Sequence, residues 1–414
     1  METIVERCVA LDVHKDTVMA CVRMPDGAGR RAQEVREFRT FTAGLRALRE
    51  WLAGHGVTQV AMEATGVYWK PVWHMLEGEP GWQLLLVNAQ HVKNLPGRKT
   101  DVADAVWLAQ LLECGLLRGS FVPPRVIQQL RDLTRYRKKL IEERTRETQR
   151  VQKLLEDAGI KLDSVVSDVL GKSARAMLDA LIRGERDPVI LAELAQTRMR
   201  RKIAELRLAL EGGFDDHHAL MLGLHLEHVD QLTAAIDRLD AEVDRAIAPF
   251  GEQHRRLTTI PGVGNRTAEV IIAEIGVDMS RFPTPAHLAS WAGMCPGNHE
   301  SAGKRRSGKA RKGDTALRSA LCESAWTVCR THGYLGSLYR QLHRRFGKKG
   351  ETKAAFAVGH AILVIVWHLL HDERDYQDLG ADFLDRRNDA EARRRYLVRQ
   401  LESLGHKVTT EPAA

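Results

Sequence analysis

The sequence places two carboxylates in the stretch Lys99-Thr100-Asp101-Val102-Ala103-Asp104-Ala105-Val106-Trp107-Leu108-Ala109. The apolar run 82–87 before it predicts a strand, and the pattern 102–112 predicts a helix with Thr100 or Asp101 as its N-cap. Asp101 and Asp104 are three residues apart, so both carboxylates fall on one helix face. A hard divalent cation such as Mg²⁺ is the usual means of holding two such groups together. The alternative is an N-cap followed by a first-turn acid that favours the helix dipole.

Two further acids stand at the ends of predicted strands. Asp12 lies in the apolar run 8–13, and Glu63 follows the run 57–62. Further strands are expected at 17–24 and 38–41. Helices are expected at 45–52 and after Trp69, the second ending at about residue 76. Such alternation is typical of an α/β sheet, whose strand ends and helix starts meet at one crevice. Four carboxylates there would suit two Mg²⁺ ions and phosphodiester chemistry, and the alternative is four unrelated solvated acids.

The composition is typical of a globular protein with more than one domain. The chain has 414 residues, of which 44% are hydrophobic. Its six cysteines form no CxxC pair, which argues against a zinc site or a disulfide framework and predicts a reducing cytoplasm. The N-terminus carries charged residues where a signal peptide needs an apolar core. The apolar run 354–370 contains two histidines and is shorter than the roughly 20 residues of a membrane span, so we expect a buried helix and no membrane partner.

The excess of positive over negative charge is confined to one segment. The formal net charge is +8, but residues 251–350 hold 17 lysines and arginines against 7 aspartates and glutamates. The rest of the chain holds 45 against 47. We therefore expect this segment to face a polyanion.

The middle of the chain reads as two long helices. From Arg125 onward apolar residues recur at helical spacing with no Gly or Pro before residue 158, which predicts a long helix with coiled-coil character. Its functional interpretation is a dimerisation or RNA-contacting arm. The basic run Arg135, Arg137, Lys138 and Lys139 favours contact with a polyanion. The alternative is an amphipathic helix packed on its own domain. A second amphipathic helix is expected at 222–247.

A glycine-rich turn opens the basic segment. The stretch 258–268, with Pro261-Gly262-Val263-Gly264-Asn265-Arg266 at its centre, predicts a helix-hairpin-helix. Gly262 and Gly264 permit a tight turn, and the free amides of a helix starting near Asn265, beside Arg266, could hold one nucleic-acid phosphate. The alternative is an ordinary connection between two helices.

A basic loop is expected from Ser301 to Lys312. Glycine and serine are interleaved with its cations, which predicts a flexible phosphate-binding strap before a helix that begins near Thr315. Its candidate nucleic-acid contacts are Lys304, Arg305, Arg306, Lys309, Arg311 and Lys312.

Two sets of motifs together resemble a known family. Asp12 in LDVHKD, Glu63 in MEATGVYW, and Asp101 with Asp104 in RKTDVADAVWLA resemble the DEDD signature of bacterial insertion-sequence family 110 transposases. The stretch LASWAGMCPGNHESAGKRRSGKARKGDTALRSALCESAW resembles the second domain of the same family. The resemblance implies an RNase H/RuvC-like domain whose four acids are catalytic and hold Mg²⁺. It also implies a nucleophilic serine at Ser301, with Ser307 as its rival.

The resemblance implies a fold of two classes, α/β and all-α. The expected domains are a RuvC-like domain at 1–124, a helical region at 125–250, a transposase domain at 251–372 and a charged tail at 373–414. The implied function is a transposase or recombinase that cuts and rejoins donor and target DNA as a dimer or tetramer, guided by an element-encoded bridge RNA. Two alternatives stay open, a RuvC-like nuclease that hydrolyses DNA with activated water and a non-catalytic nucleic-acid-binding protein.

Overall fold

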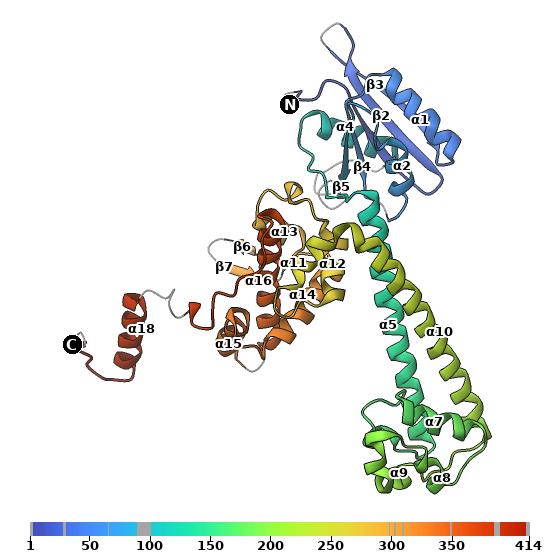
Figure 1. Ribbon diagram of the computed structural model, residues 1–414. Helices are drawn as coiled ribbons and strands as arrows, with labels where there is room; N and C mark the ends of the chain where they lie inside the picture. The colour runs from blue at the N-terminus through green and yellow to red at the C-terminus, as the bar shows by residue number, and fades with distance from the viewer. Residues whose placement is uncertain are drawn as a thin grey trace. The chain divides into compact units, whose positions relative to one another are not determined.

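The computed structural model of this chain describes residues 3–27, 30–64, 66–88, 101–297, 299–301, 304–308, 310–347, 350–384 and 390–410 (Figure 1). Within these ranges, the side chains of 101–103, 299–301, 304–307 and 390–393 are outside the described part. The chain divides into two compact units, residues 1–122 and 123–414.

The first unit is built on a mixed five-stranded sheet with the strand order β3-β2-β1-β4-β5. Strands β1 and β2 are antiparallel, as are β2 and β3, whereas β4 and β5 run parallel to β1. Its elements are β1 (Cys8–Val13), β2 (Thr17–Pro25), β3 (Arg31–Arg39), α1 (Thr42–Gly54), β4 (Gln59–Glu63), α2 (Trp69–Leu76), β5 (Gln83–Val87) and α4 (Asp101–Glu113). The predicted α/β class is therefore confirmed for this part of the chain.

The two faces of the sheet are covered by different helices (Figure 1). Because side chains alternate along a strand, Val9 and Leu11 of β1 pack with α1 and α2 on one face. Cys8 and Ala10 point to the other face, where Ala10 packs with Ala105 of α4. The central strand β1 is buried on both faces, which explains its unbroken apolar run.

The third strand differs from its prediction. The pattern predicts a strand at 38–41, whereas β3 spans Arg31–Arg39 and the chain has left the sheet by Thr40. The sequence pattern missed most of β3 because its side chains are largely polar or charged. β3 lies at the edge of the sheet, and only Phe38 along it is buried. The backbone pairs with β2 over nine residues whatever side chains it carries.

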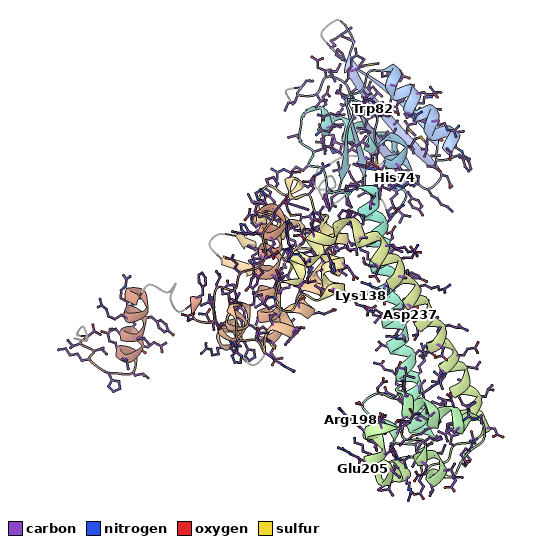
Figure 2. All side chains as sticks on the ribbon, viewed as in Figure 1. His74, Trp82, Lys138, Arg198, Glu205 and Asp237 are labelled. Carbon is purple, nitrogen blue, oxygen red and sulfur yellow. The ribbon has the colours of Figure 1, made fainter. Side chains whose placement is uncertain are left out.

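The second unit begins with two long helices that pack side by side, α5 (Arg125–Asp157) and α10 (Asp216–Ile247), as the sequence predicts. They run in opposite directions and share a core of Leu140, Leu232 and Ile236 (Figure 1). The far end of the pair carries a separate apolar core. Arg198 and Glu205 lie there (Figure 2). Its elements are α6 (Leu162–Val165), α7 (Lys172–Ile182), α8 (Pro188–Glu193), the 3-10 helix η1 (Thr197–Lys202) and α9 (Ile203–Ala209).

The rest of this unit is a helical bundle around α16 (Glu351–His371). Its elements are η2 (Ala248–Phe250), α11 (Gly251–Thr258), α12 (Asn265–Ile275), η3 (Met279–Arg281), α13 (Pro285–Trp291), β6 (His299–Ser301), β7 (Lys304–Ser307), α14 (Thr315–Val328) and α15 (Tyr334–Phe346), followed later by α18 (Ala390–Ser403). Among the described residues, α16 is the one helix long and apolar enough to cross a membrane. It packs into the bundle instead, and Trp367 donates a buried hydrogen bond of 2.8 Å from Nε1 to the Phe282 carbonyl.

The basic loop also differs from its prediction. Part of the stretch expected to be a flexible strap forms the antiparallel hairpin β6–β7. Ser301 pairs with Lys304 in its register, and an irregularity lies between His299 and Glu300. Backbone hydrogen bonds make this hairpin, so the glycine and serine content that suggested flexibility did not predict it.

Candidate active site and nucleic-acid interface

Asp12 and Glu63 lie side by side at one edge of the sheet. Strands β1 and β4 are parallel, and Leu11 is paired with Met62, so the next residue on each strand is one of the two acids. Asp12 has the same parity as Ala10, and Glu63 has the same parity as the buried Ala61. Because side chains alternate, both carboxylates therefore lie on the face that α4 covers.

Helix α4 brings its first turn toward the same edge. Its last residue, Glu113, accepts backbone hydrogen bonds from Ile4 and Val5, just before β1. Ala105, nearer the start of the helix, packs with Ala10 in the middle of the strand. The helix thus runs antiparallel to β1, so its N-terminus, which bears Asp101 and Asp104, lies toward the carboxyl end of the strand. The structure brings the backbone positions of the four predicted acids to this edge.

The environments of the acids differ. Asp12 is 8% exposed, whereas Asp104 is exposed and the side chain of Asp101 is outside the described part. His14 was not singled out from the sequence, but its Nε2 lies 3.1 Å from Asp12 Oδ2. In the sequence, the position of His14 two residues after Asp12 is the signal that could have identified it. A cavity of about 520 Å³ opens next to these residues, between the loop 13–17 and Gly66 with Tyr68.

The acids at this edge are of the ligand type that a hard divalent cation prefers. Asp12, Glu63 and Asp104 offer carboxylate oxygens from a buried strand end, its neighbour and a helix start, and Mg²⁺ prefers such oxygens to nitrogen or sulfur. Among the side chains that the structure describes, no group of three or more His, Cys, Asp or Glu is close enough to hold a metal ion. The side chain of Asp101, the fourth predicted ligand, is not among them.

The helices α11 and α12 flank the glycine-rich turn that the sequence singles out. Helix α12 begins at Asn265 as expected, and its N-cap residue Gly264 supplies no side-chain cap. Gly262 has φ +82°, and a Cβ there would lie 2.7 Å from the Ser324 carbonyl oxygen of α14. The turn therefore needs glycine both for its backbone conformation and for its close contact with α14. Arg266 is not simply presented to solvent, because its guanidinium donates to Asp240 at 2.8 Å.

The predicted nucleophile lies on the β6–β7 hairpin. Ser301 ends β6 opposite Lys304, and the rival Ser307 ends β7 opposite His299. Arg305 and Arg306 are also on β7, and the side chains of all these strand residues are outside the described part, as is the whole of Lys309. Arg311 and Lys312 are described and exposed just before α14. The hairpin thus places the serine within a basic strand pair.

Three of the four cations in the basic run of α5 have acidic partners on α12 or α14, whereas Lys139 is exposed. Arg135 donates two hydrogen bonds to Glu274 of α12, at 2.7 and 2.8 Å. Arg137 is buried and donates to Glu269 at 2.5 Å. Lys138, labelled in Figure 2, reaches Glu323 of α14 at 2.9 Å. The partners lie more than a hundred residues away in the sequence, so the run alone could not reveal them.

Two family models match this chain. A DEDD-type model described as transposase matches residues 9–160, and a model described as Transposase IS116/IS110/IS902 family matches residues 254–340. The first match spans the four acids, and the second spans the α11–α12 hairpin and β6–β7. Together the two matches cover more than half of the chain.

Several relatives carry matching names. The transposase for insertion sequence element IS1111A of Coxiella burnetii is 25% identical over 300 residues, which is 70% of this chain and 72% of that protein. The insertion element IS110 uncharacterized 43.6 kDa protein of Streptomyces coelicolor is 27% identical over 304 residues, 68% of this chain and 73% of its own length. The pilin gene-inverting protein of Moraxella bovis is 29% identical over 157 residues, 36% of this chain and 48% of its own.

Proposed function

Since this chain belongs to the IS116/IS110/IS902 family of transposases and acts as a DNA transposase or recombinase, we propose that it moves its element through a covalent serine–DNA intermediate. The single observation that carries the proposal is that the two family matches fall on the two predicted half-sites, the acids at 9–160 and the serine hairpin at 254–340. We assign the first unit to the RNase H/RuvC-like fold, and its strand order β3-β2-β1-β4-β5 with three parallel strands supports this.

In this proposal the sheet edge stabilises the scissile phosphate. Asp12, Glu63, Asp101 and Asp104 would hold Mg²⁺, which when bound supplies positive charge that neutralises the phosphate oxygens. Asp12 is buried and lies 3.1 Å from His14, so the protein fixes this carboxylate in place before substrate arrives. Asp104 is exposed on the first turn of α4, where the helix dipole and the open surface admit a DNA strand.

The covalent step belongs to the second unit. The Ser301 hydroxyl attacks phosphorus and loses its proton, and the bond from phosphorus to one deoxyribose oxygen breaks. That oxygen takes up a proton and leaves as a hydroxyl, and a phosphoserine ester remains. Attack on this ester by a hydroxyl of another DNA end restores both the phosphodiester and the serine. No bond is lost in the cycle, so rejoining needs no external energy source.

The nucleic-acid contacts divide between two elements. We assign α11–α12 as a helix-hairpin-helix whose Gly264, Asn265 and Arg266 amides bind one phosphate, supported by an N-cap without a side-chain hydrogen bond. The cations of β7 and the exposed Arg311 and Lys312 would contact further phosphates. We also propose that a bridge RNA supplies sequence recognition and that the protein works as a dimer or tetramer, because joining two DNAs requires several active sites.

The proposed chemistry is tested by trapping the adduct. The full chain is incubated with donor DNA, the RNA encoded beside its element and Mg²⁺, and the products are separated on a denaturing gel. We expect a DNA-linked protein band that Ser301→Ala abolishes. Ser307→Ala is the matched control, because it removes a hydroxyl from the same hairpin. A band lost only in Ser307→Ala would transfer the role to that serine.

The acids are tested in the same reaction. Asp104→Asn should abolish the band, whereas Glu50→Gln should retain it, because Glu50 is an exposed acid on α1, which covers the opposite face of the sheet. DNA cleavage without any adduct, surviving Ser301→Ala, would replace the proposal with hydrolysis by activated water. Binding without cleavage that is insensitive to Asp104 would indicate a non-catalytic protein.

A further inference from the structure

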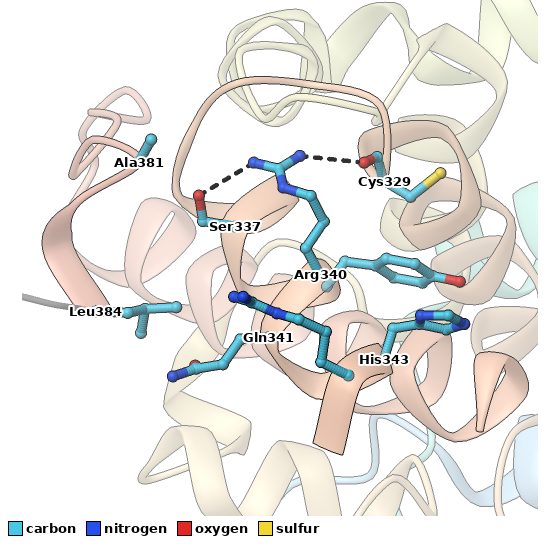
Figure 3. Close-up of a pocket in the computed structure, with 9 residues that line it drawn as sticks. Cys329, Ser337, Arg340, Gln341, His343, Ala381 and Leu384 are labelled. Atoms are coloured by element: carbon cyan, nitrogen blue, oxygen red, sulfur yellow. Dashed lines mark hydrogen bonds between the residues drawn. The ribbon is translucent and has the colours of Figure 1, made fainter. Parts of the chain in front are cut away.

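A cavity of about 500 Å³ lies beside α15, in the second unit (Figure 3). Its wall on one side is the end of α14 at Cys329, and on the other the segment of Ala381 and Leu384. Ser337, Arg340, Gln341 and Arg344 line it from α15 itself. These positions are three or four residues apart, so they form one stripe of the helix.

The stripe presents hydrogen-bond donors. Two guanidinium groups, an amide and a hydroxyl from this one helix reach the cavity, and His343 adds an imidazole. No aspartate or glutamate occurs among the described residues that line it. Glu351 lies close to one lining residue, with its Oε1 3.7 Å from His343 Nε2. A hollow with this lining favours an anion with several acceptor oxygens.

Arg340 is held in place by the protein. One of its terminal nitrogens donates to the carbonyl of Thr331 at 2.8 Å and to that of Cys329 at 3.3 Å, and the other donates to Ser337 Oγ at 3.2 Å. Figure 3 shows the bonds to Cys329 and Ser337. The two carbonyls follow the last turn of α14, so the guanidinium satisfies groups that a helix end leaves unpaired. Its positive charge is therefore fixed at the cavity wall before any ligand arrives.

Arg344 is the adaptable cation of the site. It lies one helical turn beyond Arg340 and is exposed. Beside it, the imidazole of His343 stacks on Tyr339 with ring centres 6.1 Å apart and planes within 9°. Basic residues at the end of a helix complement its dipole, which explains their charge. The dipole does not explain why hydroxyl, amide and guanidinium groups converge on one hollow.

We propose that this cavity binds a phosphodiester group of a nucleic-acid strand, with Arg340 as its fixed donor and Arg344 as the arm that closes on the phosphate. That the anion belongs to a nucleic acid rests on the proposed function. DNA and RNA offer the same group, so the experiment has an arm for each.

The test compares two neighbouring arginines in the full chain. Arg344→Gln removes a cavity-lining charge, and Arg345→Gln removes the same charge one residue on, where the side chain is exposed but does not line the cavity. Binding of a fluorescent DNA duplex and of a fluorescent RNA hairpin is measured across a salt series in EDTA. We expect Arg344→Gln to weaken one of them about tenfold and to lower the log–log salt slope by about 1. Arg345→Gln should change the affinity less than twofold.

The outcomes separate the sources. If Arg344→Gln, but not Arg345→Gln, weakens binding of the DNA duplex or of the RNA hairpin, the result supports the site and identifies the nucleic acid that it binds. Equal losses in the two variants, or none in either, overturn it, because the effect would then be general electrostatics. Inorganic phosphate at matched ionic strength is the third arm: if it alone distinguishes the variants, the site takes a free anion and the proposal is wrong. Because no cleavage occurs in EDTA, failure of the serine chemistry would leave this result untouched.

Discussion

Glu274 is a fully buried carboxyl at the contact between α12 and α5. It accepts hydrogen bonds from Arg135 at 2.7 and 2.8 Å, and Arg131 Nε lies 3.0 Å from one of its oxygens. Asp314 shares Arg135 at 2.8 Å. Burial is the largest influence and the charge of Asp314 adds to it, so that the pKa of Glu274 rises from its ordinary 4.5 to about 7 despite the hydrogen bond from Arg135.

The raised pKa makes the stability of this contact depend on pH. At a pH between the unfolded pKa of 4.5 and the folded pKa of about 7, Glu274 is protonated in the folded protein and ionised in the unfolded chain. Binding of this proton therefore stabilises the fold. This contribution is complete below the unfolded value of 4.5 and is lost as the pH rises through about 7. From about pH 5.5 to about pH 8, linkage predicts that wild type loses about 2 kcal/mol of unfolding free energy relative to Glu274→Gln, which cannot titrate.

Hydrogen exchange measures this loss locally. The amides of α12 are followed by mass spectrometry at both pH values, with exchange rates corrected for their intrinsic pH dependence. Glu269→Gln controls for the loss of a buried ion pair on the same helix, because Glu269 pairs with Arg137 at 2.5 Å. If wild type instead gains protection relative to Glu274→Gln as the pH rises, the arginines outweigh burial and our reasoning about this cluster is wrong.

Two further predictions concern the packing of each unit. Gly262→Ala should lower the stability of the second unit by about 3 kcal/mol, because the new methyl group would meet the Ser324 carbonyl at 2.7 Å in a left-handed backbone. Gly264→Ala, with nothing within 4 Å of the added carbon, should cost far less in the same thermal unfolding experiment. In the first unit, burial raises the pKa of the Cys8 thiol to about 12 and that of Cys21 to about 11. Neither should react with iodoacetamide at about pH 8 until urea unfolds the chain, and alkylation of either in the folded protein would contradict this burial.

The sequence predicts those elements of the fold whose burial requires a recognisable pattern of apolar residues. β1 and β4 are apolar because they lie inside the sheet, and β5, although it is an edge strand, buries Leu86 and Val87. α5 and α10 have long helical periodicity because one face of each packs against the other. The edge strand β3 and the hairpin β6–β7 depend on backbone pairing with a neighbour, which leaves no apolar pattern. For this reason the predicted limits of β3 were wrong, and a flexible loop was predicted where the hairpin β6–β7 forms.

For the candidate site too, some features could be predicted from local sequence patterns and others depend on contacts between distant residues. The sequence placed Asp12 and Glu63 at strand ends, whereas the parallel pairing of β1 with β4 that sets them side by side is seen only in the structure, as is the antiparallel run of α4 on β1. The neutralisation of Arg135 by Glu274 joins residues 139 positions apart and has no local signature. The hydrogen bond of His14 to Asp12 is local, but it depends on how the chain turns after β1. The catalytic roles of the acids and of Ser301 remain predictions.

The positive excess of residues 251–350 is unevenly available to a polyanion. Arg255 pairs with Asp375 and Arg266 with Asp240, both acids from outside this segment. Among described partners, no ion pair involves Arg311, Lys312 or the α15 cation Arg344, and all three are exposed. Exposed cations of the segment that form no ion pair with a described partner therefore lie before α14 and at the end of α15. The turn of α11–α12 offers its unpaired amides instead, whose short-range dipoles depend less on salt than a free guanidinium does. Phosphate binding at the turn should thus depend mainly on geometry, whereas binding at α15 should depend mainly on charge.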